Sequence, residues 1–176
     1  MALTAEQANE LIDAWVTDQS LRAHLRDVSH VMRCAALSFG REAEADTWAL
    51  AGLLHDADWQ TNPSSHPDDI VRWLRDRGEN DLAAAIATHN SAWGTAVSAM
   101  AKSLLAFDEL TGFIGAVAKV NPEGIGSVSV SSVLKKLKKR SFAASVDRNE
   151  VELGAAGIDM SLEHAIEFVL KALQAP

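Results

Sequence analysis

The chain has a single cysteine among its 176 residues, and acidic residues outnumber basic ones by 24 to 16. One cysteine, Cys34, excludes a disulfide within the chain and fits a reducing compartment. Because Cys34 lies in an alanine-rich helical stretch, we interpret it as a small buried hydrophobe. The formal net charge of −8 argues against a partner such as extended nucleic acid, since neutralising phosphates requires a positive face. Local basic patches are still compatible with this charge.

Neither a signal peptide nor a membrane span is expected from the sequence. Residues 1–15 carry acids and no basic flank before an apolar run, and no window approaches the roughly 20 apolar residues of a span. We therefore expect a cytoplasmic protein with no membrane partner. With 48% hydrophobic residues, the chain is long enough for one compact domain and too short for two ordinary ones. The expectation is one domain over residues 1–176, with core motifs at 20–120 and C-terminal helices at 128–175 packed on it.

Helical periodicity recurs along the chain and no strand-like alternation persists, so the predicted fold class is all-α, a bundle of about eight helices. Thr4 and Gln7 predict a capping box at the start of a short first helix, and Gly40 predicts the end of the second. The later helices are expected near residues 21–39, 42–55, 67–77, 80–89, 96–120, 130–139, 142–153 and 161–173.

Two histidines of the second predicted helix compete for a functional role. At about 100° per residue, His24 lies about 40° from Val28 and shares the apolar stripe, whereas His30 lies about 120° from His24. We therefore expect His24 to face the core and His30 to face water. Taken alone, His24 is compatible with an ordinary hydrogen-bonded core histidine.

His55 and Asp56 end an apolar helix that reads GLLHDAD. An ionised carboxylate there costs several kcal/mol unless it has a strong partner, and a cation between the two side chains would supply one. The alternative is a helix C-terminus at which the dipole favours the histidine and the aspartate caps the next turn.

Asp108 poses the same problem within LLAFDELTGFIGAV. Its carboxylate is expected to be metal-bound or paired with a distant Lys or Arg, unless a kink exposes it together with Glu109. His66 and His89 flank helix ends and could each be ordinary. Together with His24, His55, Asp56 and Asp108 they form a nitrogen and oxygen donor set without sulfur, which suits iron, manganese, magnesium or zinc.

The order His24, His55-Asp56 and distant Asp108 resembles the H…HD…D signature of the HD superfamily of metal-dependent phosphohydrolases. HLRDVSHVMRCAA is similar to its first motif, LAGLLHDADWQ to its second, and SLLAFDELTGFIGAVA to the helix that carries the final aspartate. SSVLKKLKKRSFAASVDRNEV is similar to the C-terminal part of a small bacterial subgroup of HD or HDIG-type proteins. This chain reads HDAD where HDIG proteins have Ile-Gly, so that label does not fit literally.

The resemblance implies that the metal ligands are His24, His55, Asp56 and Asp108, with one or two divalent ions, manganese or iron favoured. By the same resemblance, His66 and His89 are candidates for holding a second ion. Asp58 is then either a partner that orients a ligating histidine, which we favour, or a general base, and His89 is a second candidate proton carrier.

The implied reaction is attack of a metal-activated water on a small phosphate ester or phosphoanhydride, with nucleotides among the candidate substrates. Phosphate also needs cationic partners, for which Lys119 and Arg148 are the candidates. The basic run 135–140 is another candidate, although a solvated helix face explains it equally well. Trp59 could stack on a base, whereas Trp48 and Trp73 are expected in the core. The tryptophans therefore do not decide which substrate the protein takes.

Two other functions fit the same residues. A di-iron oxygenase of the HD fold would use the same six ligands with redox-active iron, and a non-catalytic module would keep the site for binding a nucleotide or other ligand. The apolar surface of the long central helix could also support a homodimer.

Overall fold

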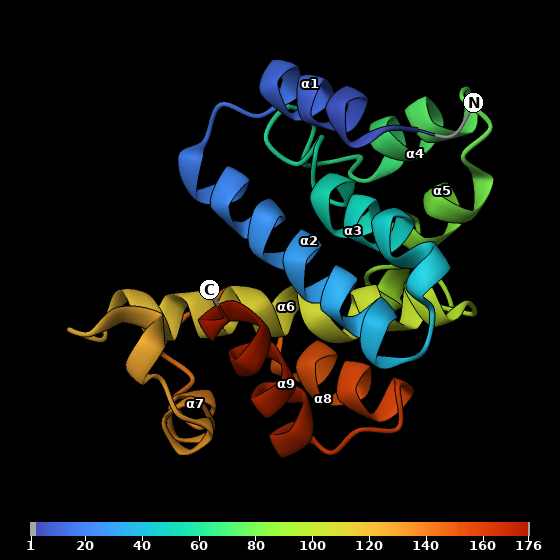
Figure 1. Cartoon of the computed structure of the whole chain (residues 1–176). Coiled ribbons are helices and arrows are strands. Elements are labelled where there is room, and N and C mark those ends of the chain that lie inside the picture. Colours follow the sequence, from blue (N-terminus) through green and yellow to red (C-terminus); the bar gives the residue numbers. More distant parts are fainter. Residues whose placement is uncertain (1–2, 176) are drawn as a thin grey trace.

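The computed structural model describes residues 3–175 and contains no strand within that range, so the predicted all-α class is confirmed (Figure 1). Short 3-10 turns interrupt the chain at Glu42–Glu44, Ser91–Trp93 and Gly124–Ser127. The described α-helices, nine in number and close to the eight expected, are α1 (Ala5–Trp15), α2 (Gln19–Ser38), α3 (Ala45–Leu54), α4 (Asp68–Arg75), α5 (Asn80–Ile86), α6 (Ala99–Lys119), α7 (Val130–Leu137), α8 (Arg148–Gly157) and α9 (Leu162–Gln174).

Local sequence signals set several helix ends as predicted. The Thr4 side chain accepts the backbone N–H of Gln7, and the Gln7 side chain accepts that of Thr4, which completes the capping box of α1. Gly40, with a φ of 68°, follows the end of α2 in the left-handed conformation that glycine adopts without strain.

The predicted helix over residues 142–153 begins six residues late, at Arg148. The Arg148 guanidinium donates to the carbonyl oxygens of Ala143 and Val146, both at 2.7 Å, and also to that of Phe142. These bonds hold residues 142–147 as a turn, in which Ala143 has a φ of 43°. Side-chain hydrogen bonds to the backbone have therefore replaced the first helical turn here.

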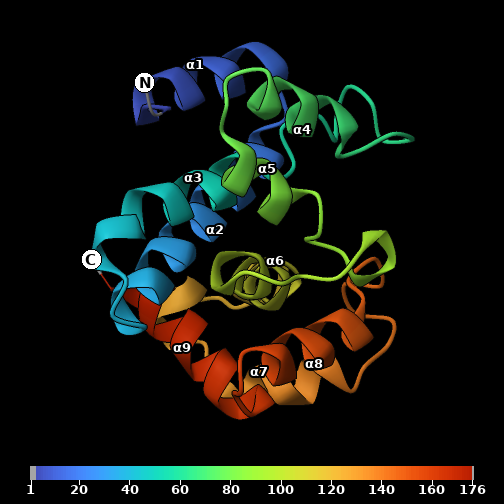
Figure 2. The ribbon, with the colours of Figure 1, turned by 90° about the vertical axis from the view of Figure 1, so that its right-hand side faces the viewer.

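Helix α6 lies in the middle of the molecule, between an N-terminal layer that includes α2 and α3 and a C-terminal layer that includes α8 and α9 (Figures 1 and 2). Two glycines allow the closest helix crossings. A Cβ on Gly52 of α3 would lie 2.6 Å from the Ser29 nitrogen of α2, and one on Gly154 of α8 would lie 2.5 Å from the Cα of Ala106 of α6. The first crossing joins α2 to α3 and the second joins α6 to α8, and α6 also contacts both α2 and α3.

Aromatic and aliphatic side chains fill the space between the layers. Trp48 is fully buried, as expected, whereas Trp73 is only partly buried beside the Arg77 guanidinium. Cys34 is half-buried rather than buried, because its position on α2 places its Sγ beside His30, 3.7 Å from Nε2. Among the described helices, none is both long enough and apolar enough to cross a membrane.

Candidate metal centre

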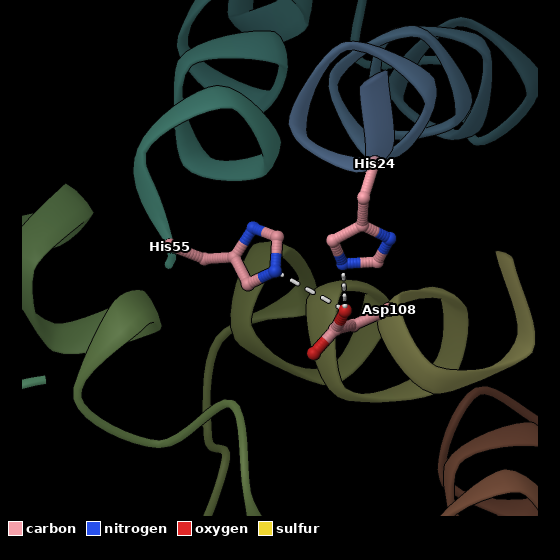
Figure 3. A group of neighbouring side chains, drawn as sticks. All are labelled: His24, His55 and Asp108. Carbon is pink, nitrogen blue, oxygen red and sulfur yellow. Dashed lines mark hydrogen bonds and ion pairs between the residues drawn. The ribbon is translucent and has the colours of Figure 1, made fainter. Parts of the chain in front are cut away.

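Three helices deliver His24, His55 and Asp108 to one point (Figure 3). The Asp108 Oδ1 atom lies 2.9 Å from His24 Nε2 and 3.1 Å from His55 Nε2. His30 lies elsewhere, with its Nε2 atom 3.1 Å from the Ala172 carbonyl oxygen of α9. Helical position thus distinguishes the two histidines, and His30 is exposed, as expected, despite its contact with α9. We call His24, His55 and Asp108 the first triad.

A second triad stands beside the first and consists of Asp56, His66 and His89. The Asp56 Oδ1 atom lies 3.0 Å from His66 Nε2 and 3.4 Å from His89 Nε2, and the two imidazole nitrogens are 3.3 Å apart. The structure therefore brings together all six residues that the resemblance assigned to metal binding, in two groups of three.

Asp56 connects the two triads. Its Oδ1 atom faces the histidines of the second triad, while its Oδ2 atom lies 3.7 Å from His55 Nε2 in the first. This arrangement follows from the HD dipeptide, because adjacent residues at a helix end point in different directions. The carboxylate is therefore placed to contact ions in both triads.

Backbone carbonyl oxygens orient two histidines of the centre through the ring nitrogen that faces away from the triads. His55 Nδ1 lies 2.9 Å from the Gly52 carbonyl oxygen, and His89 Nδ1 lies 2.6 Å from that of Ile86. A carbonyl oxygen only accepts, so each Nδ1 donates and each Nε2 is directed to its triad. Sequence reasoning missed these partners. The available signal was the position of each histidine at a helix end, where the carbonyl oxygen three residues earlier is free to accept a hydrogen bond from the ring.

Asp58 performs the same task for His66. Its Oδ1 atom lies 2.5 Å from His66 Nδ1, and its Oδ2 atom accepts the backbone N–H groups of Asp69 and Ile70 at 2.9 and 3.0 Å. Asp58 is fully buried. With both oxygens engaged behind the centre, its position fits the orienting role.

The two triads fit divalent ions by donor type and by spacing. Ligands about 2.1 Å from an ion and at right angles to each other lie about 3 Å apart, close to the separations within each triad. The Nε2 atom of His55 is fully buried and has no hydrogen bond among the described residues, despite its proximity to Asp108. A buried nitrogen without a hydrogen bond is costly in a core but is expected of a ligand atom.

The pKa values within the centre show that its carboxylates require positive charge nearby. Burial lowers the pKa of His55, but the carboxylates of Asp108 and Asp56 outweigh it and raise the pKa to about 10. Burial likewise opposes protonation of His66, whose pKa Asp56 and Asp58 raise to about 9. Burial would raise the pKa of Asp56, yet the surrounding histidines hold it well below its usual range. Without a metal ion, protons on His55 and His66 therefore offset charge on the neighbouring carboxylates.

A cavity of about 320 Å³ opens beside the triads. Burial and the charge of Asp108 raise the pKa of Glu109, one of its lining residues, to about 7. Besides Asp56, Asp108, His66 and His89, the cavity is lined by Trp59, Asn90, Trp93, Glu109, Ser145, Val146 and Glu150.

Neither predicted phosphate partner lines this cavity. Lys119 is exposed at the end of α6. The Arg148 guanidinium is hydrogen-bonded to carbonyl oxygens of the 142–147 turn. The basic run 135–140 lies on and after α7, with Leu134 and Leu137 turned partly inward, as the solvated-face interpretation predicted. The structure thus gives the cavity no lysine or arginine.

A family model described as HD domain matches residues 21–122, a range that contains both triads. Comparisons with curated proteins and with solved structures give no match. The matched range spans more than half of the chain and contains the His24, His55-Asp56 and Asp108 motifs in their expected order. The chain therefore belongs to the HD domain family, whose superfamily is one of metal-dependent phosphohydrolases.

Proposed function

We propose that this protein is a metal-dependent phosphohydrolase that cleaves a small phosphate ester or phosphoanhydride. The observation that carries the proposal is the pair of His/Asp triads joined through Asp56, members of which line a single cavity. When bound in the triads, divalent ions would acidify a water molecule and neutralise charge on a phosphoryl oxygen.

The residues of the chain have separate tasks in this scheme. His24, His55 and Asp108 would hold one ion, His66 and His89 the other, and Asp56 would lie between them. The carbonyls of Gly52 and Ile86 and the Asp58 carboxylate fix the tautomers of three histidines. His89, proposed from the sequence as a proton carrier, has both ring nitrogens engaged if it is a ligand, so we assign it to the metal.

Phosphate release by metal-loaded protein tests the proposal. The chain is stripped with chelator, reloaded with Mn²⁺ or Fe²⁺, and assayed against p-nitrophenyl phosphate, pyrophosphate, and nucleoside mono- and triphosphates. We expect wild-type activity that chelator abolishes and a loss of at least about 100-fold in Asp56→Asn, more than an orienting partner alone would cost.

The matched control is Asp76→Asn, which changes an exposed acid at the end of α4 and should leave activity unchanged. Bound iron without any phosphate release would favour the oxygenase instead. A loaded protein that binds phosphate compounds without turning them over would favour the non-catalytic module.

A further inference from the structure

The charges around the cavity restrict which phosphate compounds it can take. Besides the histidines of the second triad, its ionisable lining residues are four acids, Asp56, Asp108, Glu109 and Glu150, and the lining includes no lysine or arginine. Phosphate sites in proteins usually rely on such cations in addition to any metal. The positive charge for a substrate must therefore come from the metal ions alone.

Two divalent ions would leave little positive charge to spare. Asp56 and Asp108 offset half of their charge, and what remains matches the roughly two negative charges of one phosphomonoester group. Each further phosphate would add negative charge beside Glu109 and Glu150 without any counter-charge. This balance disfavours di- and triphosphates.

Glu109 and Glu150 remain without cationic partners. Among the described residues neither forms an ion pair with a lysine or arginine. Glu150 is almost fully buried and accepts the backbone N–H of Ser91 at 3.2 Å as well as its hydroxyl. Glu109 is half-buried and directly follows Asp108 on α6. Carboxylates in such positions favour a positively charged ligand group.

Two tryptophans line the same cavity and remain accessible. Trp59 is 48% exposed and Trp93 42% exposed. Both pack edge-on against the His66 ring, with centroids 5.2 and 5.3 Å away, and Trp93 also packs edge-on against His89 at 5.0 Å. Accessible tryptophan rings beside carboxylates are the combination that binds ammonium and quaternary ammonium groups.

We infer that the substrate is a small phosphomonoester with one phosphoryl group and a positively charged amine, an aminoalkyl phosphate. This inference rests on the proposed hydrolase function. The phosphoryl group would lie at the triads, and the amine would lie between Glu109 and the two tryptophans. A volume of about 320 Å³, near the lower end for small-molecule sites, fits a substrate of this size. Hydrolysis adds a water oxygen to phosphorus, breaks the phosphorus–oxygen ester bond and leaves the amino alcohol with a proton from water.

The test compares phosphocholine with 3,3-dimethylbutyl phosphate, its uncharged isostere, on the full metal-loaded chain. We expect kcat/KM to favour phosphocholine by about 10-fold or more, the preference that a desolvated ammonium on tryptophan would give. Glu109→Gln and Trp93→Leu should each reduce this ratio several-fold. Glu152→Gln, which neutralises an exposed acid on α8, should leave the ratio unchanged.

The outcomes separate this inference from the function on which it rests. Equal turnover of phosphocholine and its isostere would overturn the inference and leave the hydrolase standing, as would a preference for a nucleoside triphosphate. A ratio that neither variant changes would remove Glu109 and Trp93 from amine recognition. Absence of phosphate release from every compound, p-nitrophenyl phosphate included, would overturn both proposals.

Discussion

Asp58 stands behind His66, and its position makes a prediction at the scale of single residues. Asp58→Asn keeps the shape of the side chain but removes the charge that holds His66 Nδ1 and that caps the first N–H groups of α4. We expect affinity for the ion at the second triad to fall about 10- to 100-fold. Calorimetric titration with Mn²⁺ measures this, with Asp76→Asn as the control. Unchanged affinity in both variants would show that the Asp58–His66 contact does not support metal binding.

The raised pKa values of His55 and His66 predict opposite pH dependences for stability and for metal binding. Both values, about 10 and about 9, exceed the usual 6.5, so protonation stabilises the folded, metal-free chain. That stabilisation is complete below about pH 6.5 and is lost as the pH rises through 9 to 10. Metal ions must displace the same protons, so metal affinity should rise over this range.

Urea unfolding with chelator at pH 6.5, 8 and 9.5, together with Mn²⁺ titrations at the same pH values, tests both trends. The expected results are an unfolding midpoint that falls and an affinity that rises. A midpoint that climbs between pH 6.5 and 9.5 would contradict the assigned pKa shifts.

Single residues also show where prediction from sequence succeeds and where it fails. Helical angle distinguishes His24 from His30 because the period of an α-helix is known in advance. Arg148, predicted as a phosphate partner, does not line the cavity, and nothing in the sequence reveals that three carbonyl oxygens lie within reach of its guanidinium. The division of six donors into two triads likewise depends on helix crossings that no local pattern specifies.

At the scale of helices, the contact between α2 and α3 controls the distance between His24 and His55. Gly52 has no room for a Cβ, which would lie 2.6 to 2.7 Å from the backbone of Val28 and Ser29. Gly52→Ala should push the two helices apart, destabilise the fold by about 1–3 kcal/mol, and weaken metal binding. Thermal unfolding and Mn²⁺ titration measure the two effects.

Gly115→Ala is the matched control for this crossing. Gly115 lies within α6, and a Cβ there would meet nothing within 4 Å. Without crowding, the change should stabilise the chain by about 0.5–1 kcal/mol through helix propensity. If both alanines shifted the unfolding temperature in the same direction, close contact at Gly52 would not be what limits the crossing.

Helix ends were predictable where the sequence contains a recognisable capping residue, as at Thr4 and Gly40. The start of α8 was not, because it depends on hydrogen bonds from Arg148 to the carbonyl oxygens of the preceding turn, which periodicity cannot detect. The missed residues matter for the site, since Ser145 and Val146 of that turn line the cavity.

Across the whole molecule, the six donors all fall within the matched range 21–122, and α6 carries the last of them between the two layers (Figure 2). The C-terminal part completes the cavity with residues of the 142–147 turn and with Glu150 of α8. The all-α class was predictable from periodicity. The acidic lining was not, because it depends on which charges from α6 and α8 meet. That residues 1–176 form one domain, and that the chain forms a homodimer, both stay predictions.

The most direct test of the central claim is the number of ions bound per chain. Mass spectrometry on protein that is stripped, reloaded with Mn²⁺ and freed of excess ion should find about two ions in the wild type, one for each triad. His66→Ala should keep about one, and Asp56→Ala, which removes the carboxylate shared by both triads, should keep fewer than one. A wild type that holds no ion after reloading would contradict the metal centre, and with it the proposed hydrolase.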